Sequence, residues 1–244
     1  MLVLIFKEIK YFFITPIGYI ILGIFWTFNT LLFIVIQNDY NFFQKSFIDF
    51  NEFFTITPWM LIVLIPIIVM RSFSEEFQSG TIDLLISKPI SLINILWSKF
   101  FGCLFLFILS ISPSIINIIY VFQFSSPDSQ VDFQVIIGSY FGLLLLVSTF
   151  ISLCLPISII FKNQITIFIA SSFICFLQYF LFDQLSVLSN SDFLYELILN
   201  IGSQEHYSKF ISGVMPIIDI GYFVGLDVLL MGVSLFFLNK YRHQ

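Results

Sequence analysis

The sequence predicts an all-α, polytopic membrane protein with six transmembrane helices. Of its 244 residues, 59% are hydrophobic and 10% are charged, whereas a soluble domain carries about 25% charged residues. The mean hydropathy is +1.01, and apolar runs long enough to cross a bilayer as helices recur along the whole chain. The composition therefore excludes a soluble globular protein, and no polar stretch is long enough to form an extramembrane domain.

The apolar runs define the expected spans of a single transmembrane domain that covers residues 1–244. Residues 1–10 form a short amphipathic segment at the membrane surface, and Pro16 follows near the start of the first span, where its missing N–H costs little. Pro66 favours a bend in the second span. Residues 183–215, before the last span, are expected to include a surface-lying helix. The spans are residues 16–36, 53–70, 100–122, 135–161, 165–182 and 216–238.

The charges differ between the two sides that this topology defines. Six spans place both termini on one side, and eight of the ten Lys and Arg residues fall there: Lys7, Lys10, Arg71, Lys88, Lys99, Lys162, Lys240 and Arg242. Basic residues next to spans mark the cytoplasmic side. We therefore expect cytoplasmic N- and C-termini, a cytoplasmic segment at residues 71–99, and a location in the bacterial cytoplasmic (inner) membrane.

The sequence contains no motif for catalysis or metal binding. The patterns H-E-x-x-H, G-x-S-x-G and G-x-x-x-x-G-K-[ST] are absent. Cys103, Cys154 and Cys175 lie within apolar segments at spacings that fit neither a zinc site nor a disulfide framework. His206 and His243 are extramembrane and isolated in the sequence. We therefore expect no enzyme activity, no metal and no cofactor in this chain, and no nucleic-acid partner.

Two carboxylates, Asp219 and Asp227, are the candidate ionisable groups within the last span. At eight positions apart they lie about 80° from one another around a helix, so they share a broad face at best. Such a pair can relay protons or cations, but no ionisable group in another span completes a path. The alternative is that Asp219 lies at the outer interface and Asp227 faces the bundle interior or a partner.

Residues 71–99 form the most informative polar segment of the chain. It alternates apolar residues with charged ones and lies between two strongly apolar runs. Such a segment can lie along a membrane surface and present its polar side to a soluble partner. Its pattern consists of Glu75, Glu76, Gly80, Thr81, Ile82, Asp83, Leu84, Leu85 and Pro89, followed by Lys99 at the start of the next span.

This pattern resembles the segment E-E-x-x-x-G-T-[ILM]-[ED]-L-L…P that precedes the third span in ABC-2 type transporter permeases. The resemblance implies that the segment couples the permease to a separate ATPase subunit, which binds ATP and Mg²⁺, and that a second permease subunit completes the pathway. In physical terms, Gly80 permits a backbone reversal and Thr81 can cap the following helix. The expectation is that Ile82, Leu84 and Leu85 insert into the interface or a groove of the ATPase. The acids Glu75, Glu76 and Asp83 are expected to remain available to the partner.

A second resemblance covers residues 204–223, immediately before and within the start of the last span. The positions His206, Tyr207, Phe210, Gly213, Val214, Asp219, Tyr222 and Phe223 are similar to a stretch found there in bacterial ABC-2 permeases. Over nearly its full length, the chain also resembles the gliding-motility-associated (GldF-type) permease subunits of Bacteroidetes. Asp227 is not part of this pattern, so its role stays open.

The resemblance implies a transmembrane permease subunit of an ABC exporter, linked to gliding motility or to export of a cell-surface component. Two alternatives from other classes remain: a non-transporting scaffold of a motility or secretion machine, and an ion-coupled secondary transporter. The residues specify neither the substrate nor the direction of transport, nor whether the second permease is a copy of this chain.

Overall fold

The computed structural model of the chain describes residues 2–30, 51–82, 85, 90–124, 133–188 and 191–242. Helices make up the regular structure of these residues, and no strand occurs among them, which confirms the all-α class. The elements are α1 (Leu2–Ile14), α2 (Pro16–Thr30), α3 (Asn51–Gln78), α5 (Leu92–Phe124), α6 (Phe133–Ile160), α7 (Gln164–Phe176), the π-helical η2 (Leu177–Leu181), α8 (Phe182–Val187), α9 (Asp192–Leu199), α10 (Ser203–Ile211) and α11 (Ile217–Arg242).

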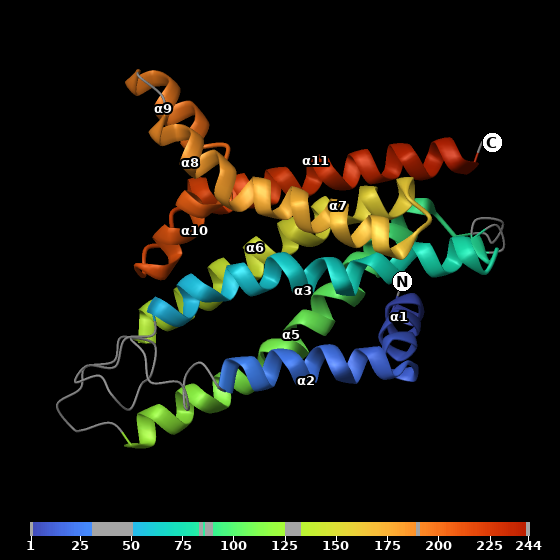
Figure 1. The fold of residues 1–244 in the computed structure, drawn as a ribbon, viewed down its shortest axis with the longest axis horizontal. Helices are drawn as coiled ribbons and strands as arrows, with labels where there is room; N and C mark the ends of the chain where they lie inside the picture. Colours follow the sequence, from blue (N-terminus) through green and yellow to red (C-terminus); the bar gives the residue numbers. More distant parts are fainter. Residues whose placement is uncertain are drawn as a thin grey trace.

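The long helices run side by side along one axis of an elongated bundle (Figure 1). Within the described residues, five helical segments are long and apolar enough to cross a membrane: Phe53–Gln78, Leu92–Ile116, Phe133–Ile160, Gln164–Val187 and Ile217–Arg242. A sixth is present if α1 and α2, which meet at a bend of 78°, form one broken span. Of the expected first span, α2 covers the residues up to Thr30, and residues 31–36 lie outside the described part.

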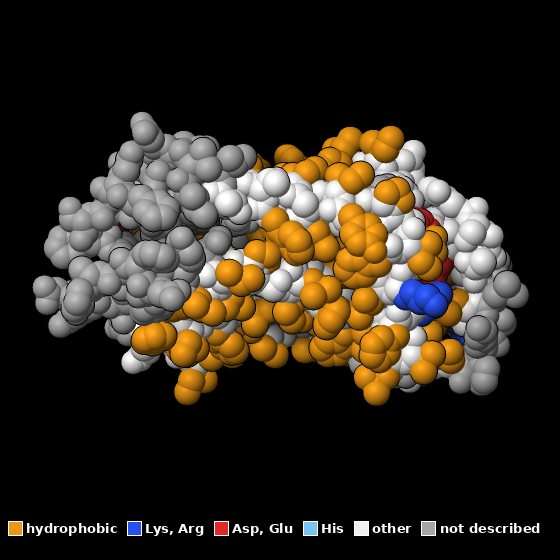
Figure 2. Space-filling model, turned by 90° about the horizontal axis from the view of Figure 1, so that it is seen from below, with side chains coloured by type: hydrophobic (Ala, Val, Ile, Leu, Met, Phe, Trp, Pro, Cys, Tyr) orange, Lys and Arg blue, Asp and Glu red, His pale blue; other side chains and the backbone are white. Residues whose placement is uncertain are grey.

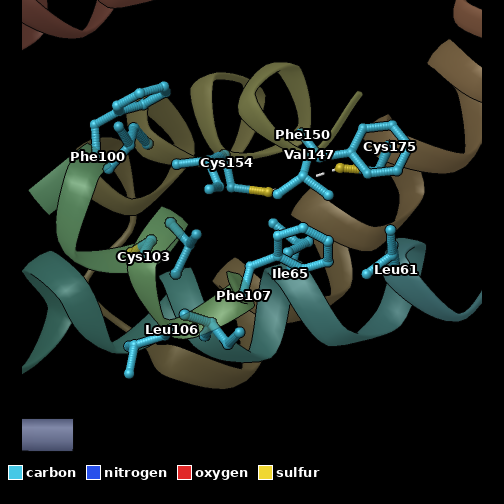
Figure 3. Packing of buried hydrophobic residues seen from close by; sticks show 14 of the residues in the cluster. Leu61, Ile65, Phe100, Cys103, Leu106, Phe107, Val147, Phe150, Cys154 and Cys175 are labelled. Atoms are coloured by element: carbon cyan, nitrogen blue, oxygen red, sulfur yellow. Dashed lines mark hydrogen bonds between the residues drawn. The ribbon is translucent and has the colours of Figure 1, made fainter. Parts of the chain in front are cut away.

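Helix α6 lies at the centre of the bundle and contacts α3, α7, α10 and α11. Its side chains Leu143, Leu146, Phe150 and Leu155 are fully buried. Figure 3 shows how side chains from α3, α5, α6 and α7 meet around this helix. The apolar residues of the central span thus form the core, whereas those of the outer helices cover the surface.

Much of the exposed surface is apolar, as expected for a protein surrounded by lipid. In the face drawn in Figure 2, hydrophobic side chains cover the middle of the bundle, and charged side chains appear only towards the end where α1 lies. The last residues of α11 also lie at this end, on the side of the bundle away from α1 (Figure 1). We call it the charged end of the bundle; α9 and α10 lie at the opposite end.

The segment of residues 71–99 differs from its prediction as a surface-lying polar stretch. Helix α3 continues to Gln78, and α5 already begins at Leu92, so both ends of the segment are extensions of the long helices. The physical reason is that their charges are paired within the bundle. Arg71 and Glu75, for example, form an i,i+4 ion pair with Nε and Oε1 at 3.0 Å, which supports the helix.

The stretch before the last span contains α9 and α10, and the two differ in their surroundings. Helix α9 has no buried residue and projects from the bundle beside α8 (Figure 1). Helix α10 instead buries Tyr207 and Phe210 against the bundle, because its apolar residues fall on one face. The chain then turns at Gly213, whose φ of +82° favours glycine, and enters α11.

Candidate functional site

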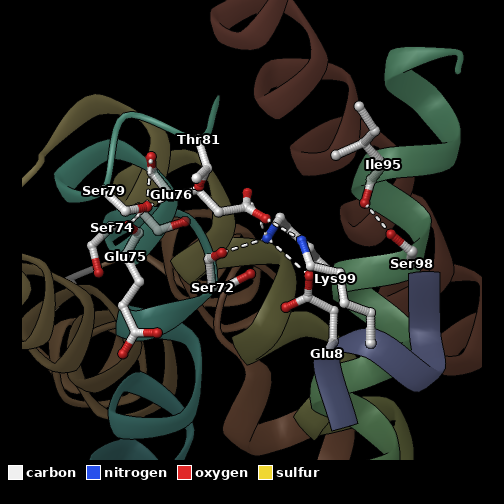
Figure 4. Close-up of polar contacts among 12 residues, drawn as sticks. Glu8, Ser72, Ser74, Glu75, Glu76, Ser79, Thr81, Ile95, Ser98 and Lys99 are labelled. Atoms are coloured by element: carbon white, nitrogen blue, oxygen red, sulfur yellow. Dashed lines mark hydrogen bonds and ion pairs between the residues drawn. The ribbon is translucent and has the colours of Figure 1, made fainter. Parts of the chain in front are cut away.

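The charged end of the bundle holds a cluster of paired ionic side chains centred on Lys99 of α5 (Figure 4). The lysine side chain is 1% exposed. Its Nζ lies 3.0 Å from Glu76 Oε2 of α3 and 3.2 Å from Glu8 Oε1 of α1. It also donates to the backbone carbonyl of Ser72. One buried cation therefore connects α1, α3 and α5.

Two further pairs fix α1 and the bend that follows it against α3. Lys7 Nζ lies 3.0 Å from Glu76 Oε1, so Glu76 bridges two lysines. Arg71 donates from Nη1 to the hydroxyl of Thr15 over 2.7 Å, and this threonine lies between α1 and α2. Because these contacts join segments that are far apart in the sequence, they determine where α1 lies on the ends of α3 and α5.

The cluster is balanced in charge, which explains how it tolerates burial. It contains three carboxylates, at Glu8, Glu75 and Glu76, and three cations, at Lys7, Arg71 and Lys99. A buried charge is costly unless it is paired and hydrogen-bonded. The arrangement meets this requirement and leaves no net charge that would attract a strongly anionic or cationic ligand.

A cavity of about 280 Å³ lies beside the cluster, between α1, α3 and the turn after α3. Five of its lining residues are charged residues of the cluster: Lys7, Glu8, Arg71, Glu75 and Glu76. The hydroxyl of Ser72 and the Oε2 atom of Glu75 are buried there without a hydrogen-bond partner among the described residues. Polar groups of this kind are normally satisfied by water, so the cavity has the chemistry of a hydrated pocket at the base of α1.

The structure corrects the expectation that Glu75 and Glu76 are free for a partner. Both carboxylates are largely buried, Glu75 beside Arg71 and Glu76 between Lys7 and Lys99. Ile82 and Leu85, expected at the interface, are buried within the chain's own hydrophobic core. The acids and these apolar side chains therefore support the internal packing of the turn. Asp83, Leu84 and Pro89 lie outside the described residues.

Gly80 and Thr81 occupy the turn that was expected at this place. Gly80 has a φ of +68°, the left-handed conformation that favours glycine. The hydroxyl of Thr81 lies 2.8 Å from the hydroxyl of Ser79, and its carbonyl accepts from the N–H of Leu85 over 3.0 Å. Residues 78–81 are exposed and form the outermost described part of the segment.

The residues of the second pattern come together at the opposite end of the bundle. His206 of α10 bonds through Nδ1 to Asp219 of α11, and Lys209 Nζ lies 3.3 Å from the same carboxylate oxygen. The His206 ring stacks on Tyr222 with centroids 3.9 Å apart. One expectation is thereby corrected, because His206 is not isolated, and Asp219 is buried in the first turn of α11. The pairing joins different helices, so no local sequence signal reports it.

Tyr207 and Gly213, which belong to the same pattern, make contacts that hold helices together. The Tyr207 hydroxyl donates to the backbone carbonyl of Phe54 in α3 over 2.8 Å. At Gly213, an added Cβ would lie 2.8 Å from Val135 Cγ2, so both the positive φ and the close contact require glycine. These residues fix α10 against α3 and α6.

Asp227 lies about two turns further along α11 than Asp219 and does not share a partner with it. Its Oδ2 atom accepts from the hydroxyl of Ser148 on α6 over 2.6 Å. Its Oδ1 atom is buried with no hydrogen-bond partner among the described residues. In the described part of the chain, no group of three His, Cys, Asp or Glu residues lies close enough together to hold a metal ion. The two aspartates therefore belong to separate clusters.

Sequence reasoning missed the residues that organise the charged end. Glu8 was covered only by the expected amphipathic start, and Lys7 was used only there and for the sidedness of the charges. In the structure Glu8 lies against Lys99 and Lys7 against Glu76. A weak signal was present in Gly102, where an added Cβ would lie 3.0 Å from the Cβ of Glu8. A glycine at this point of a span permits the close approach of a second helix.

Comparison with known proteins gives one positive result. The family model described as ABC-2 family transporter protein matches residues 29–224. No curated protein matches the chain. The matched range runs from the end of α2 to the first residues of α11. It includes the whole cluster around His206 and Asp219, and the cluster around Lys99 except for its residues on α1.

Proposed function

The chain belongs to the ABC-2 family of transporter proteins, and we propose that it is the permease subunit of an ABC exporter that works with a separate ATPase subunit. The observation that carries this proposal is the family match over residues 29–224, which is most of the chain. The sequence contains no phosphate-binding loop. ATP and Mg²⁺ therefore bind to the partner, and this chain supplies the path through the membrane.

The proposed complex contains two permease subunits and two ATPase subunits. Five or six spans form half of a pathway, which a second permease, identical or different, completes. The complex lies in the bacterial inner membrane with the charged end towards the cytoplasm. The distribution of Lys and Arg residues supports this orientation, as does the position of α1 and the end of α11 at one end of the bundle.

The ATPase docks on the turn between α3 and α5. Because Glu75 and Glu76 are engaged in ion pairs within the chain, the groups offered to the partner are those of exposed residues 78–81. Glu75 and Glu76 then transmit movement of the turn to the neighbouring helices and do not bind the ATPase themselves. Movement of the turn reaches α1 and α5 through Glu76 and Lys99, whose charges lie 3.0 Å apart.

The cargo that we propose is a component of the cell surface. The support is the resemblance of the chain, over nearly its full length, to gliding-motility-associated permease subunits. A strain that lacks this chain should lose a surface component and, in a gliding species, its movement. If surface composition and movement are both unchanged, the cargo assignment fails while the permease assignment stands.

The docking proposal is tested by co-purification with the ATPase and by ATP turnover in lipid. Thr81→Arg places a large side chain on the proposed docking surface and should reduce both partner recovery and turnover. Ser208→Arg is the matched control, because Ser208 is also exposed but lies on α10 at the opposite end. Wild-type recovery and turnover for Thr81→Arg would show that the turn is not the docking surface.

The same preparation separates an exporter from a non-transporting scaffold. A spin label at Gln78, which is exposed next to the turn, should change its mobility between the nucleotide-free and ATP-bound complexes. An unchanged spectrum, together with stable binding of the ATPase, would favour a scaffold.

A further inference from the structure

A second exposed turn lies beside the proposed docking turn at the charged end of the bundle. It consists of residues 161–163 between α6 and α7, and all three are exposed. Gln78 donates from Nε2 to the backbone carbonyl of Lys162 over 3.1 Å, and the Lys162 Nζ atom lies 6.0 Å from the centre of the Phe77 ring. The side chain of Asn163 caps α7, so the turn has a defined conformation next to α3.

The end of α11 reaches the same place. The Tyr241 ring meets the Phe77 ring edge to face, with centroids 5.1 Å apart and 82° between the planes. Lys240 and Arg242 flank Tyr241 in the last turn of the helix, and both are exposed. The ends of α3, α6 and α11 lie together at the charged end (Figure 1). The α6–α7 turn and the last turn of α11 therefore both lie against Phe77, the residue that precedes the docking turn.

The charges around Phe77 differ from those of the cluster around Lys99. Three exposed cations form no ion pair among the described residues, and we call them the basic surface: Lys162, Lys240 and Arg242. The carboxylates at this end of α3 are already paired with the cations of the other cluster. An exposed surface with unpaired charge of one sign favours a partner that presents the opposite sign, which here means carboxylates.

We propose that the basic surface is a second part of the ATPase contact and binds carboxylates of the ATPase subunit. This inference rests on the proposed docking of the ATPase at residues 78–81 and extends that contact to the α6–α7 turn and the end of α11. A specific interface buries about 800 Å² on each partner, far more than a turn of four residues supplies. Because Gln78 and Lys162 are hydrogen-bonded to one another, a protein that covers the first turn also reaches the second.

Binding of the purified ATPase to the permease in nanodiscs of phosphatidylcholine tests the proposal, because this lipid has no net charge to attract the basic surface. Lys162→Glu should weaken binding about fivefold at low salt, the effect of losing an exposed ion pair. The difference from the wild type should shrink as salt screens the charges. Lys10→Glu is the matched control, since Lys10 is exposed at the same end but lies on α1, and it should bind the ATPase like the wild type.

Thr81→Arg, measured in the same discs, separates this inference from the proposed function. If Thr81→Arg loses the ATPase while Lys162→Glu binds it like the wild type, the basic surface is not part of the contact and docking at the turn stands. If both variants bind like the wild type, docking at the turn fails and its extension fails with it. If Lys162→Glu weakens binding only in discs that contain phosphatidylglycerol, the basic surface acts through anionic lipid headgroups and the proposal is overturned.

Cross-linking with a carbodiimide, which joins an amine directly to a carboxylate, tests the contact in the complete complex without any substitution. Lys162 and Lys240 should form amides with Asp or Glu residues of the ATPase, identified by mass spectrometry. Lys10 should form none with that subunit. The proposal is wrong if the links from Lys162 and Lys240 lead only to carboxylates of this chain, or if neither lysine is linked at all.

Discussion

Lys99 of α5 and Glu76 of α3 form an ion pair of 3.0 Å in which 1% of the lysine side chain is exposed. A second carboxylate, that of Glu8, completes the surroundings of the cation at 3.2 Å. Burial of this kind makes the three charges interdependent, because each would be costly without the others. The pair therefore fixes the amphipathic α1 to the ends of two spans, next to the proposed ATPase contact.

Lys99→Met should destabilise the protein by about 3–5 kcal/mol, the cost of leaving a buried charge without its partner. The free energy of unfolding is measured by denaturant titration in mixed micelles. Adding Glu8→Gln should recover part of the loss, because it removes the carboxylate that loses its cation, whereas Glu76 keeps its ion pair with Lys7. Lys10→Met serves as the control, since Lys10 is exposed on the same α1. Equal stability of Lys99→Met and the control would refute the structural role of the ion pair.

The fold class was predictable because its signal is local. Hydropathy and the length of the apolar runs depend on consecutive residues, so an all-helical membrane domain follows from the sequence. The ends of the helices were not predictable in the same way. Residues 71–78 are as polar as a loop, yet α3 continues through them, because their charges find partners on α1 and α5. Those partners are distant in the sequence, as Glu8 and Lys99 illustrate.

The candidate site was predicted in part for the same reason. Gly80 was identifiable because a positive φ requires a particular residue type. The orientation of Glu75 and Glu76 was not predictable. Two adjacent glutamates look the same in the sequence whether they face a partner or an internal lysine. The pairing of His206 with Asp219 depends on how α10 lies against α11, which only the three-dimensional structure reveals.

Gly80→Ala should destabilise the turn after α3 by about 1–2 kcal/mol, the cost of a left-handed conformation for a residue with a Cβ. The space around Gly80 is open, so the cost comes from its φ of +68° and not from a clash. Gly23→Ala is the matched control: its surroundings are also open, but it lies within α2, where alanine should stabilise by roughly 0.5–1 kcal/mol. Denaturant titration of both variants distinguishes them, and a neutral Gly80→Ala would contradict the conformation of the turn.

Gly142→Ala should loosen the contact between α6 and α10. A Cβ at this position would lie 2.4 Å from the Cβ of Phe210, which is far below contact distance. Overpacking of this kind costs about 1–3 kcal/mol. Gly225→Ala on α11 is the control, because nothing lies within 4 Å of the added atom. Hydrogen exchange of residues 203–211 should increase in Gly142→Ala only, and unchanged protection there would show that α10 does not depend on this contact.

Asp227→Asn should leave transport and ATPase binding close to those of the wild type. The side chain is held by one hydrogen bond of 2.6 Å to the hydroxyl of Ser148, and an amide of the same shape can keep that bond. Interhelical hydrogen bonds of this type contribute about 0.6 kcal/mol on average in membrane proteins. We therefore assign Asp227 to the packing of α11 against α6.

Ser148→Ala is the companion variant, because it removes the same hydrogen bond from the other side and should produce an equally small change in stability. Substrate transport in proteoliposomes and co-purification of the ATPase are measured for both. An ion-coupled secondary transporter predicts the opposite for the aspartate, since an amide cannot release or take up the proton that drives the cycle. If Asp227→Asn abolished transport while the ATPase remained bound and Ser148→Ala stayed active, the carboxylate would be part of an ion path and not a packing group.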